Sequence, residues 1–158
     1  MTDYAKILVI DDDSSTRKVL SVALEDEGYI VDIAENGREA IRKSKTNFYN
    51  LALIDIRLPD MEGTKLLTEM KDTVPKMIKI IVTGYPGLQN AIDAVNHGAD
   101  AYVVKPFKMD ELLKTVRENL QEQELAKKYG EERIREFVEA RVAELEREAS
   151  KRTSSSEL

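Results

Sequence analysis

Four groups of polar side chains that could do chemistry together stand at the ends of short apolar runs. Asp11–Asp13 are three consecutive aspartates after the first run, and Asp55 lies at the end of the third. Thr83 ends the fourth run and Lys105 ends the fifth. If these runs are parallel strands, their carboxyl ends meet at one edge of a sheet, which is where open α/β sheets bind ligands. We therefore expect the four groups to share one site.

Carboxylates gathered in this way repel one another, which raises their pKa values unless a positive charge lies among them. A cluster of oxygen ligands without His or Cys suits a hard cation, so Mg²⁺ or Mn²⁺ is the expected cofactor. With that cation and Lys105 stabilising charge, Asp55 could act as a nucleophile towards phosphorus. The Thr83 hydroxyl could then donate to the bound phosphoryl group. The pattern predicts a phosphoryl-transfer site.

The elements that would position this site alternate between strand and helix. Strands separated by helices of about ten residues indicate right-handed βαβ units and a parallel, doubly wound α/β sheet. The predicted strands are Lys6–Ile10, Tyr29–Ala34, Leu51–Ile56, Ile78–Thr83 and Ala101–Lys105. Ser14 or Ser15 would cap the first helix. The third and fourth helices are expected at Thr64–Lys71 and Leu88–His97.

Composition excludes several classes of protein. A net charge of −6 argues against non-specific nucleic-acid binding, which needs a basic surface. The absence of cysteine rules out disulfides and thiolate metal sites. No apolar run approaches the roughly 18 residues of a membrane span, and no signal-peptide core follows Met1. We expect a cytoplasmic protein that binds neither nucleic acid nor membrane.

Residues 1–122 resemble the receiver domain of two-component response regulators. The residues that carry the resemblance are Asp11, Asp12, Asp55, Pro59, Gly63, Thr83-Gly84, Tyr102 and Lys105-Pro106-Phe107. The resemblance implies a flavodoxin-like sheet in the order 2-1-3-4-5. It also implies that Asp55 accepts a phosphoryl group from phosphohistidine on a sensor histidine kinase or phosphotransfer protein.

The same resemblance assigns the metal ligands. Asp12, Asp55 and the backbone carbonyl of Arg57 would hold Mg²⁺, and Asp11 would help through water. Asp13 is not a ligand position of the family, so we expect it to be an exposed acidic neighbour or a helix cap.

The resemblance also implies a conformational switch formed by Thr83 and Tyr102. In receivers of this kind the Lys105–Pro106 peptide bond is cis. The family resemblance alone implies these features, since the spacing of the residues does not establish them.

The chain after residue 122 changes character, becoming rich in Glu, Lys and Arg. We expect 123–130 to finish the fifth helix or act as a linker broken at Gly130. An amphipathic helix is expected at 131–150 and a disordered tail at 151–158. The apolar stripe of that helix is Ile134, Phe137, Val138, Val142, Leu145 and Ala149. Such a stripe needs a partner, and we favour a homodimer with antiparallel or crossing tail helices over a monomer with the tail folded back.

Three functions remain open at this point. One is a phosphorylation switch that signals through protein–protein contact, and another is the receiver and linker of a transcription regulator whose effector domain lies beyond Leu158. The third is a phosphatase of the haloacid dehalogenase type, with Asp11 as its nucleophile. The phosphatase needs a second acidic pair at a strand end after Lys105, whereas Asp110-Glu111 opens a helix. We expect a signalling domain and not a turnover enzyme.

Overall fold

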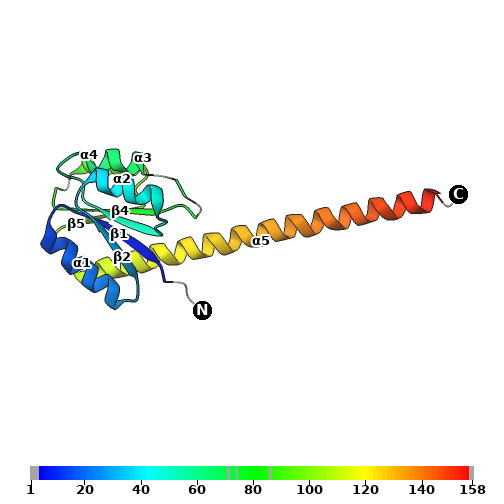
Figure 1. Ribbon diagram of the computed structural model, residues 1–158, viewed down its shortest axis with the longest axis horizontal. Helices are drawn as coiled ribbons and strands as arrows, with labels where there is room; N and C mark the ends of the chain where they lie inside the picture. The colour runs from blue at the N-terminus through cyan, green and yellow to red at the C-terminus, as the bar shows by residue number, and fades with distance from the viewer. Residues whose placement is uncertain (1–3, 71, 74, 86, 157–158) are drawn as a thin grey trace. The chain divides into compact units, whose positions relative to one another are not determined.

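The structure is a computed structural model that describes residues 4–70, 72–73, 75–85 and 87–156 (Figure 1). It divides into two compact units, Met1–Gln123 and Glu124–Leu158, which are described separately below. None of the helices in the described ranges is long and apolar enough to cross a membrane.

The first unit is built on a five-stranded parallel sheet in the order β2-β1-β3-β4-β5. Its strands are β1 (Lys6–Ile10), β2 (Ile30–Ala34), β3 (Leu51–Ile54), β4 (Ile78–Thr83) and β5 (Ala101–Val104). The three central strands are almost entirely buried, which explains their near-continuous apolar sequences. The predicted α/β class and strand order are confirmed.

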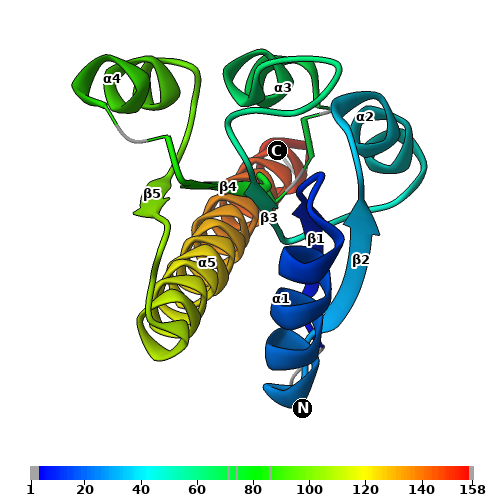
Figure 2. The ribbon, with the colours of Figure 1, turned by 90° about the vertical axis from the view of Figure 1, so that its left-hand side faces the viewer.

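Helices cover both faces of the sheet (Figure 2). They are α1 (Ser14–Asp26), α2 (Gly37–Thr46), α3 (Gly63–Glu69), α4 (Leu88–Asn96) and α5 (Met109–Ser156). One core layer lies under α1 and the beginning of α5, where Leu20, Leu24, Leu112 and Val116 are buried. The other lies under the remaining helices and includes Ala40, Leu66, Leu67 and Ala94. The carboxyl ends of the strands are thereby held in fixed register.

The cap of α1 differs from the prediction. Asp13, and neither Ser14 nor Ser15, is the N-cap, and its carboxylate accepts from the backbone N–H of Thr16 at 3.1 Å. The same carboxylate accepts the Thr16 hydroxyl at 2.5 Å. Aspartate caps a helix as well as serine does, and its position one residue earlier places both serines inside the first turn. The expectation that Asp13 is a helix cap is confirmed.

Helix α5 also differs from the prediction, because it continues without a break through Gly130 to Ser156. Glycine inside a helix costs only about 1 kcal/mol relative to alanine, and strong helix formers surround it here. The helix also includes Lys151–Ser156, where the sequence favoured disorder; residues 157 and 158 lie outside the described part.

Candidate functional site

The four predicted groups lie at the carboxyl ends of the strands. Asp11 directly follows β1, Asp55 follows β3 and Lys105 follows β5, while Thr83 is the last residue of β4. Because β1, β3 and β4 are parallel neighbours in the sheet, their carboxyl ends lie side by side. Asp55 is 7% exposed and Thr83 is fully buried. The third strand ends one residue before Asp55, so this carboxylate lies at the mouth of the sheet and not within it.

The carboxylates of Asp11, Asp12 and Asp55 form one cluster. One oxygen from each lies within 4.8 Å of the others. The ammonium of Lys105 lies 2.7 Å from Asp11 Oδ2 and 3.4 Å from Asp55 Oδ2. Three ionised carboxylates against one ammonium leave two negative charges unbalanced, which matches the charge of a divalent cation. The all-oxygen donor set fits Mg²⁺ or Mn²⁺.

Burial and charge act against one another at Asp55. Burial raises the pKa of this carboxyl and the nearby charge of Asp11 raises it further, while Lys105 and the backbone N–H of Arg57 oppose the rise without cancelling it. Burial would lower the pKa of Lys105, but its bonds to Asp11 and Asp55 raise it overall. The lysine therefore stays cationic, and Asp55 remains short of favourable partners.

Asp11 is fixed from every side. Its backbone N–H donates to the carbonyl of Ala34 at 3.2 Å, and its Oδ1 accepts from the backbone N–H of Asp13 at 2.9 Å. Its own carbonyl accepts from Arg17 Nη1 at 2.6 Å. Arg17 is only 8% exposed, and the sequence analysis did not predict that it would contact the site. The one feature of the sequence that could have indicated this contact is the position of Arg17 near the start of α1, six residues after Asp11.

The loop between β3 and α3 is tightly closed below Asp55. The N–H of Gly63 donates to the carbonyl of Ile56 at 2.6 Å, and a side chain at Gly63 would put its Cβ 2.6 Å from the carbonyl oxygen of Asp55. Only glycine fits there without displacing the backbone. The N–H of Arg57 donates to Asp55 Oδ1 at 3.3 Å, while the role of the Arg57 carbonyl as a metal ligand stays a prediction.

The same loop is tied to α2 by Asp60. Its two carboxylate oxygens accept from the backbone N–H groups of Gly37 and Arg38, at 2.8 and 2.9 Å. These bonds lower the pKa of the Asp60 carboxyl although burial opposes them. A residue from the site loop thus supplies a cap to a helix on one face of the sheet.

On the other side of the site, the hydroxyl of Thr83 at the end of β4 already accepts a hydrogen bond. Thr83 Oγ1 accepts from the backbone N–H of Tyr85 at 3.1 Å. The guanidinium of Arg57 lies 4.0 Å from the centre of the Tyr85 ring, a cation–π contact that joins the two loops. Sequence reasoning predicted Thr83 but missed the contact of Arg57 with Tyr85, because the two residues are far apart in the chain.

Tyr102 on β5 carries a buried hydroxyl that has no hydrogen-bond partner among the described residues. Burial raises the pKa of this phenol. The ring borders a groove of about 590 Å³ whose other walls include Pro106, Phe107 and Leu112. The Lys105–Pro106 peptide bond is cis, the form that the resemblance implies.

Comparisons with known proteins agree with this geometry. The family described as response regulator receiver domain matches residues 7–117. The regulatory protein AtoC of Escherichia coli (strain K12) is 37% identical over 127 residues, covering 80% of this chain and 28% of AtoC. The chain thus spans less than a third of that relative's length.

Two solved structures are similar to the first unit. A CheY-like receiver domain protein from Methanospirillum hungatei JF-1 has 45% sequence identity and a TM-score of 0.75, covering 78% of this chain and 99% of its own. The beryllofluoride-activated NtrC4 receiver domain dimer has 33% identity and a TM-score of 0.70, covering 75% and 98%. With the sheet order and the acidic cluster beside Lys105, these matches establish that the chain belongs to the response regulator receiver domain family of two-component signalling.

Proposed function

We propose that Asp55 accepts a phosphoryl group from phosphohistidine on a sensor kinase or phosphotransfer protein. The observation that carries the proposal is Asp55, 7% exposed and short of partners, beside the cation of Lys105. A carboxylate oxygen of Asp55 attacks phosphorus, the P–N bond to the histidine breaks, and the imidazole leaves with the bonding electron pair. Lys105 stabilises charge on the transferring group.

The acidic cluster would hold Mg²⁺ or Mn²⁺ through Asp12, Asp55 and the carbonyl of Arg57, with Asp11 acting through water. Once bound, the cation supplies positive charge to the oxygens of the transferring phosphoryl group. The residues themselves provide the fixed frame, because Asp11 is held by four hydrogen bonds that involve its backbone and side chain.

The donor would approach over α1. An apolar groove of about 390 Å³ borders Lys105 and would accept a helix of the kinase. Its lining residues are Ser15, Thr16, Val19, Leu20, Lys105, Pro106, Phe107 and Met109. The exposed side chain of Val19 would be one anchor.

The switch would run through Thr83 and Tyr102. The Thr83 hydroxyl, now paired with the N–H of Tyr85, would turn to donate to the phosphoryl group. That movement would free space for the Tyr102 ring, whose hydroxyl has no partner to lose among the described residues. A differential of a few kcal/mol suffices to shift such a two-state element. Thr83→Ala should abolish the chemical-shift changes of α4 and β5 on phosphorylation; changes equal to those of the wild type would refute the coupling.

The output would be contact with a downstream protein. The alternative is a transcription regulator in which this chain supplies the receiver and linker helix, and it is favoured by the likeness to the longer regulatory protein AtoC. The phosphatase hypothesis has no comparable support, because Asp110 and Glu111 lie in the first turn of α5. The length of the native open reading frame would separate the first two.

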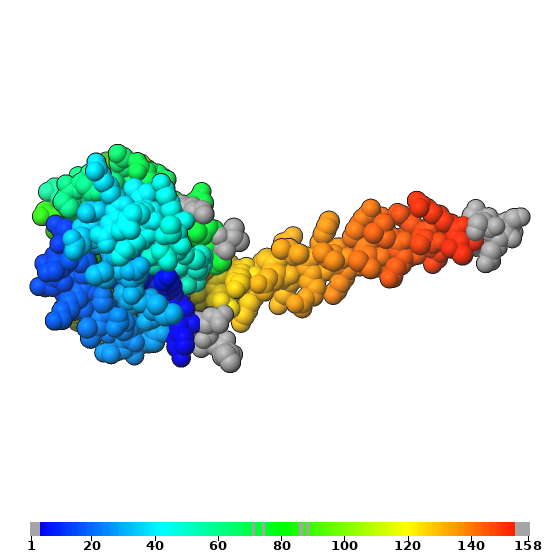
Figure 3. Space-filling model, in the orientation of Figure 1, coloured from blue at the N-terminus to red at the C-terminus, as the bar shows by residue number. Residues whose placement is uncertain are grey.

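Self-association would come from the second unit. In the described part of this unit, which Figure 3 draws from yellow to red, residues 124–156 belong to one helix, with no second helix there to pack on. The large apolar residues of the stripe, Ile134, Phe137, Val138, Val142 and Leu145, are 47% to 73% exposed. An isolated helix is marginal in water, so a homodimer with antiparallel or crossing helices would bury the stripe. Light scattering on the full chain and on residues 1–123 tests this; two monomers at high micromolar concentration would exclude it.

Intact-mass spectrometry tests the phosphoacceptor. With a small-molecule acyl phosphate and Mg²⁺, the wild type and Asp13→Asn should gain the mass of one phosphoryl group. Asp55→Asn should gain none, and a chelator should prevent the gain in every variant. Asp13 is the matched control, since it adjoins the cluster but caps α1. A gain on Asp55→Asn equal to that of the wild type would overturn the proposal.

A further inference from the structure

The free edge of the sheet at β2 carries a sequence suited to strand pairing. Residues 29–34 read Tyr-Ile-Val-Asp-Ile-Ala, with aromatic and β-branched residues, no proline and a single charge at Asp32. Ile30 is 51% exposed and Ile33 is 39% exposed. Segments of this kind pair with other strands when they lie at an open edge.

The direction of each backbone group in β2 follows from its pairing with β1. The N–H of Ile30 donates to Ala5, and the carbonyl of Ala34 accepts from Asp11. Because the direction alternates along a strand, Ile30, Asp32 and Ala34 turn their backbone groups towards β1. Val31 and Ile33 are then the two residues of β2 whose N–H and carbonyl groups point away from the sheet.

Both outward groups of Ile33 are already bonded to side chains. Its N–H donates to Asp32 Oδ1 at 2.9 Å, and its carbonyl accepts from the ammonium of Lys43. Lys43 and Asp32 are themselves paired at 3.1 Å. One ion pair thus occupies the donor and the acceptor that a further strand would need at this residue.

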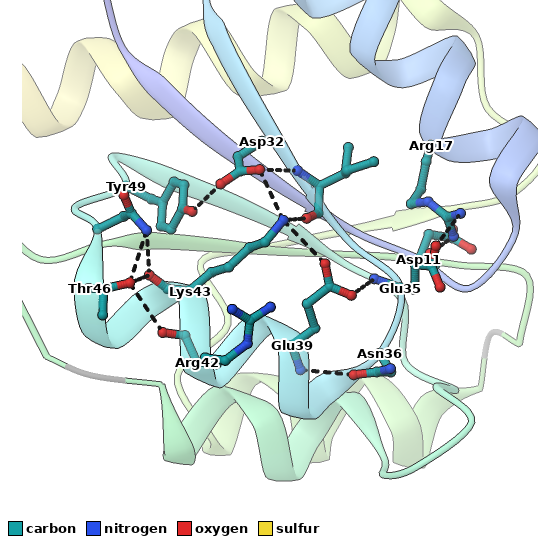
Figure 4. Close-up of polar contacts among 12 residues, drawn as sticks. Asp11, Arg17, Asp32, Glu35, Asn36, Glu39, Arg42, Lys43, Thr46 and Tyr49 are labelled. Carbon is teal, nitrogen blue, oxygen red and sulfur yellow. Dashed lines mark hydrogen bonds and ion pairs between the residues drawn. The ribbon is translucent and has the colours of Figure 1, made fainter.

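Two more side chains anchor the pair (Figure 4). The hydroxyl of Tyr49, a fully buried residue, donates to Asp32 Oδ2 at 2.6 Å, and Lys43 also pairs with Glu39 at 3.2 Å. Burial opposes both charges, yet bonds from Tyr49 and Lys43 lower the pKa of Asp32. Bonds to Asp32 and Glu39 likewise raise the pKa of Lys43. The pair is therefore held in its charged form near neutral pH.

We propose that the Asp32–Lys43 pair closes the β2 edge to a second copy of this chain. Two copies could meet β2 to β2 about a two-fold axis, which makes the edge self-complementary. Such a ladder would use the outward groups of Val31 and Ile33, and with those of Ile33 occupied only Val31 remains. The pair leaves self-association to other surfaces, and this inference does not depend on phosphorylation of Asp55.

The test removes the ammonium and keeps the aliphatic stem. Lys43→Met frees the carbonyl of Ile33, and Lys45→Met is the matched control, because both lysines lie in the last turn of α2 and Lys45 lacks the contacts of Lys43 with β2. Asp32→Asn is a second variant that retains an acceptor for the Tyr49 hydroxyl. The full chain of each is measured by light scattering over a range of concentrations and by amide hydrogen exchange at Val31 and Ile33.

Lys43→Met should associate at least about tenfold more tightly than the wild type and Lys45→Met, a difference of about 1.4 kcal/mol. Amide hydrogen exchange at Val31 should slow as the concentration of Lys43→Met rises. Unchanged association, or association that leaves Val31 exchange unaffected, would overturn the proposal. If Lys43→Met does not fold, Lys43→Leu, which also removes the ammonium from the carbonyl of Ile33, decides between the same outcomes.

Discussion

Two clusters of aspartate and lysine lie at different edges of the same sheet, and the pKa values of their aspartates are shifted in opposite directions. At the carboxyl edge, Asp55 lies beside Lys105 and Asp11, and its pKa is raised. At the β2 edge, Asp32 lies beside Lys43, and its pKa is lowered. The residue types are the same, so the difference comes from burial, which is deeper at Asp55, and from the partners that each carboxylate has.

Asp32 accepts from a tyrosine hydroxyl, a lysine and a backbone N–H, at 2.6 to 3.1 Å. Asp55 has only longer contacts, 3.3 Å to the N–H of Arg57 and 3.4 Å to Lys105, and it shares that lysine with Asp11. A satisfied cluster contributes stability, whereas a buried carboxylate with unmet bonding capacity is prepared for a ligand.

Cation binding should show the largest difference between the clusters. At 100 times its dissociation constant, Mg²⁺ should raise the free energy of unfolding of the wild type by about 2.7 kcal/mol. Asp32→Asn should keep this increment and Asp55→Asn should lose most of it, because only Asp55 belongs to the acidic cluster. Urea unfolding followed by circular dichroism, with and without a chelator, measures both. Equal increments in the two variants would remove the distinction.

Truncation of Asp32 should come next. Asp32→Ala leaves the buried Tyr49 hydroxyl without its acceptor and removes one of the two carboxylate partners of Lys43, so it should lower the free energy of unfolding by about 1–3 kcal/mol. Adding Tyr49→Phe should cost less than the sum of the two single changes, since the pair is in contact. Additive losses in urea denaturation would show that the hydrogen bond has little energetic weight.

The two variants Asp32→Asn and Asp55→Asn should change the free energy of unfolding in opposite directions near neutral pH, and acid should reduce both changes. The pKa of Asp32 lies below its ordinary value of 3.8 in the folded chain, so its contribution is complete above pH 3.8 and is lost as the pH falls through the folded pKa. Asp55, whose folded pKa lies above 3.8, becomes less destabilising as the pH falls through that raised pKa. Without divalent cations, the stability deficit of Asp32→Asn relative to the wild type should therefore shrink at low pH, and the stability advantage of Asp55→Asn should shrink as well. Differences of the same sign for the two variants near neutral pH would contradict one of the assignments.

Removing Lys105 should have the smallest effect on the resting fold. In saturating Mg²⁺, the cation would replace the charge of the ammonium among the carboxylates. Under that condition Lys105→Met should change the free energy of unfolding less than Asp32→Ala does. The response to phosphorylation should nevertheless be blunted in NMR spectra. Lys43→Met is the comparison, and it should retain that response. A normal response in Lys105→Met would rule out the assigned role.

The sequence predicted the parts of the molecule that local patterns determine. Short apolar runs located the five strands, and the polar residues that end them located Asp55, Thr83 and Lys105. The strand order needed the family resemblance, because no local pattern says which parallel strands are neighbours.

Contacts between distant residues could not be predicted in this way. The pair of Asp32 with Lys43 and the contact of Asp32 with Tyr49 join residues 11 and 17 positions apart, and nothing in either segment names the other. At Gly130 a local rule was given too much weight, since the helix propensity of the neighbouring residues outweighs one glycine. At α1 two good caps competed with a third, and only the backbone geometry decided for Asp13.

The two loops that border the site are held in different ways. The loop that carries Asp55 is joined to α2 through two backbone amides and closed on itself through Gly63. In the opposite loop, Tyr85 is held by the Thr83 hydroxyl, which phosphorylation would redirect, and also by Asn90 and the guanidinium of Arg57. A rotation of the Thr83 hydroxyl towards Asp55 would therefore release one of the contacts of the loop that leads to α4, whereas the bonds of Asp60 to α2 would be unchanged. The surface formed by α4 and β5 would then be the one whose conformation depends on phosphorylation.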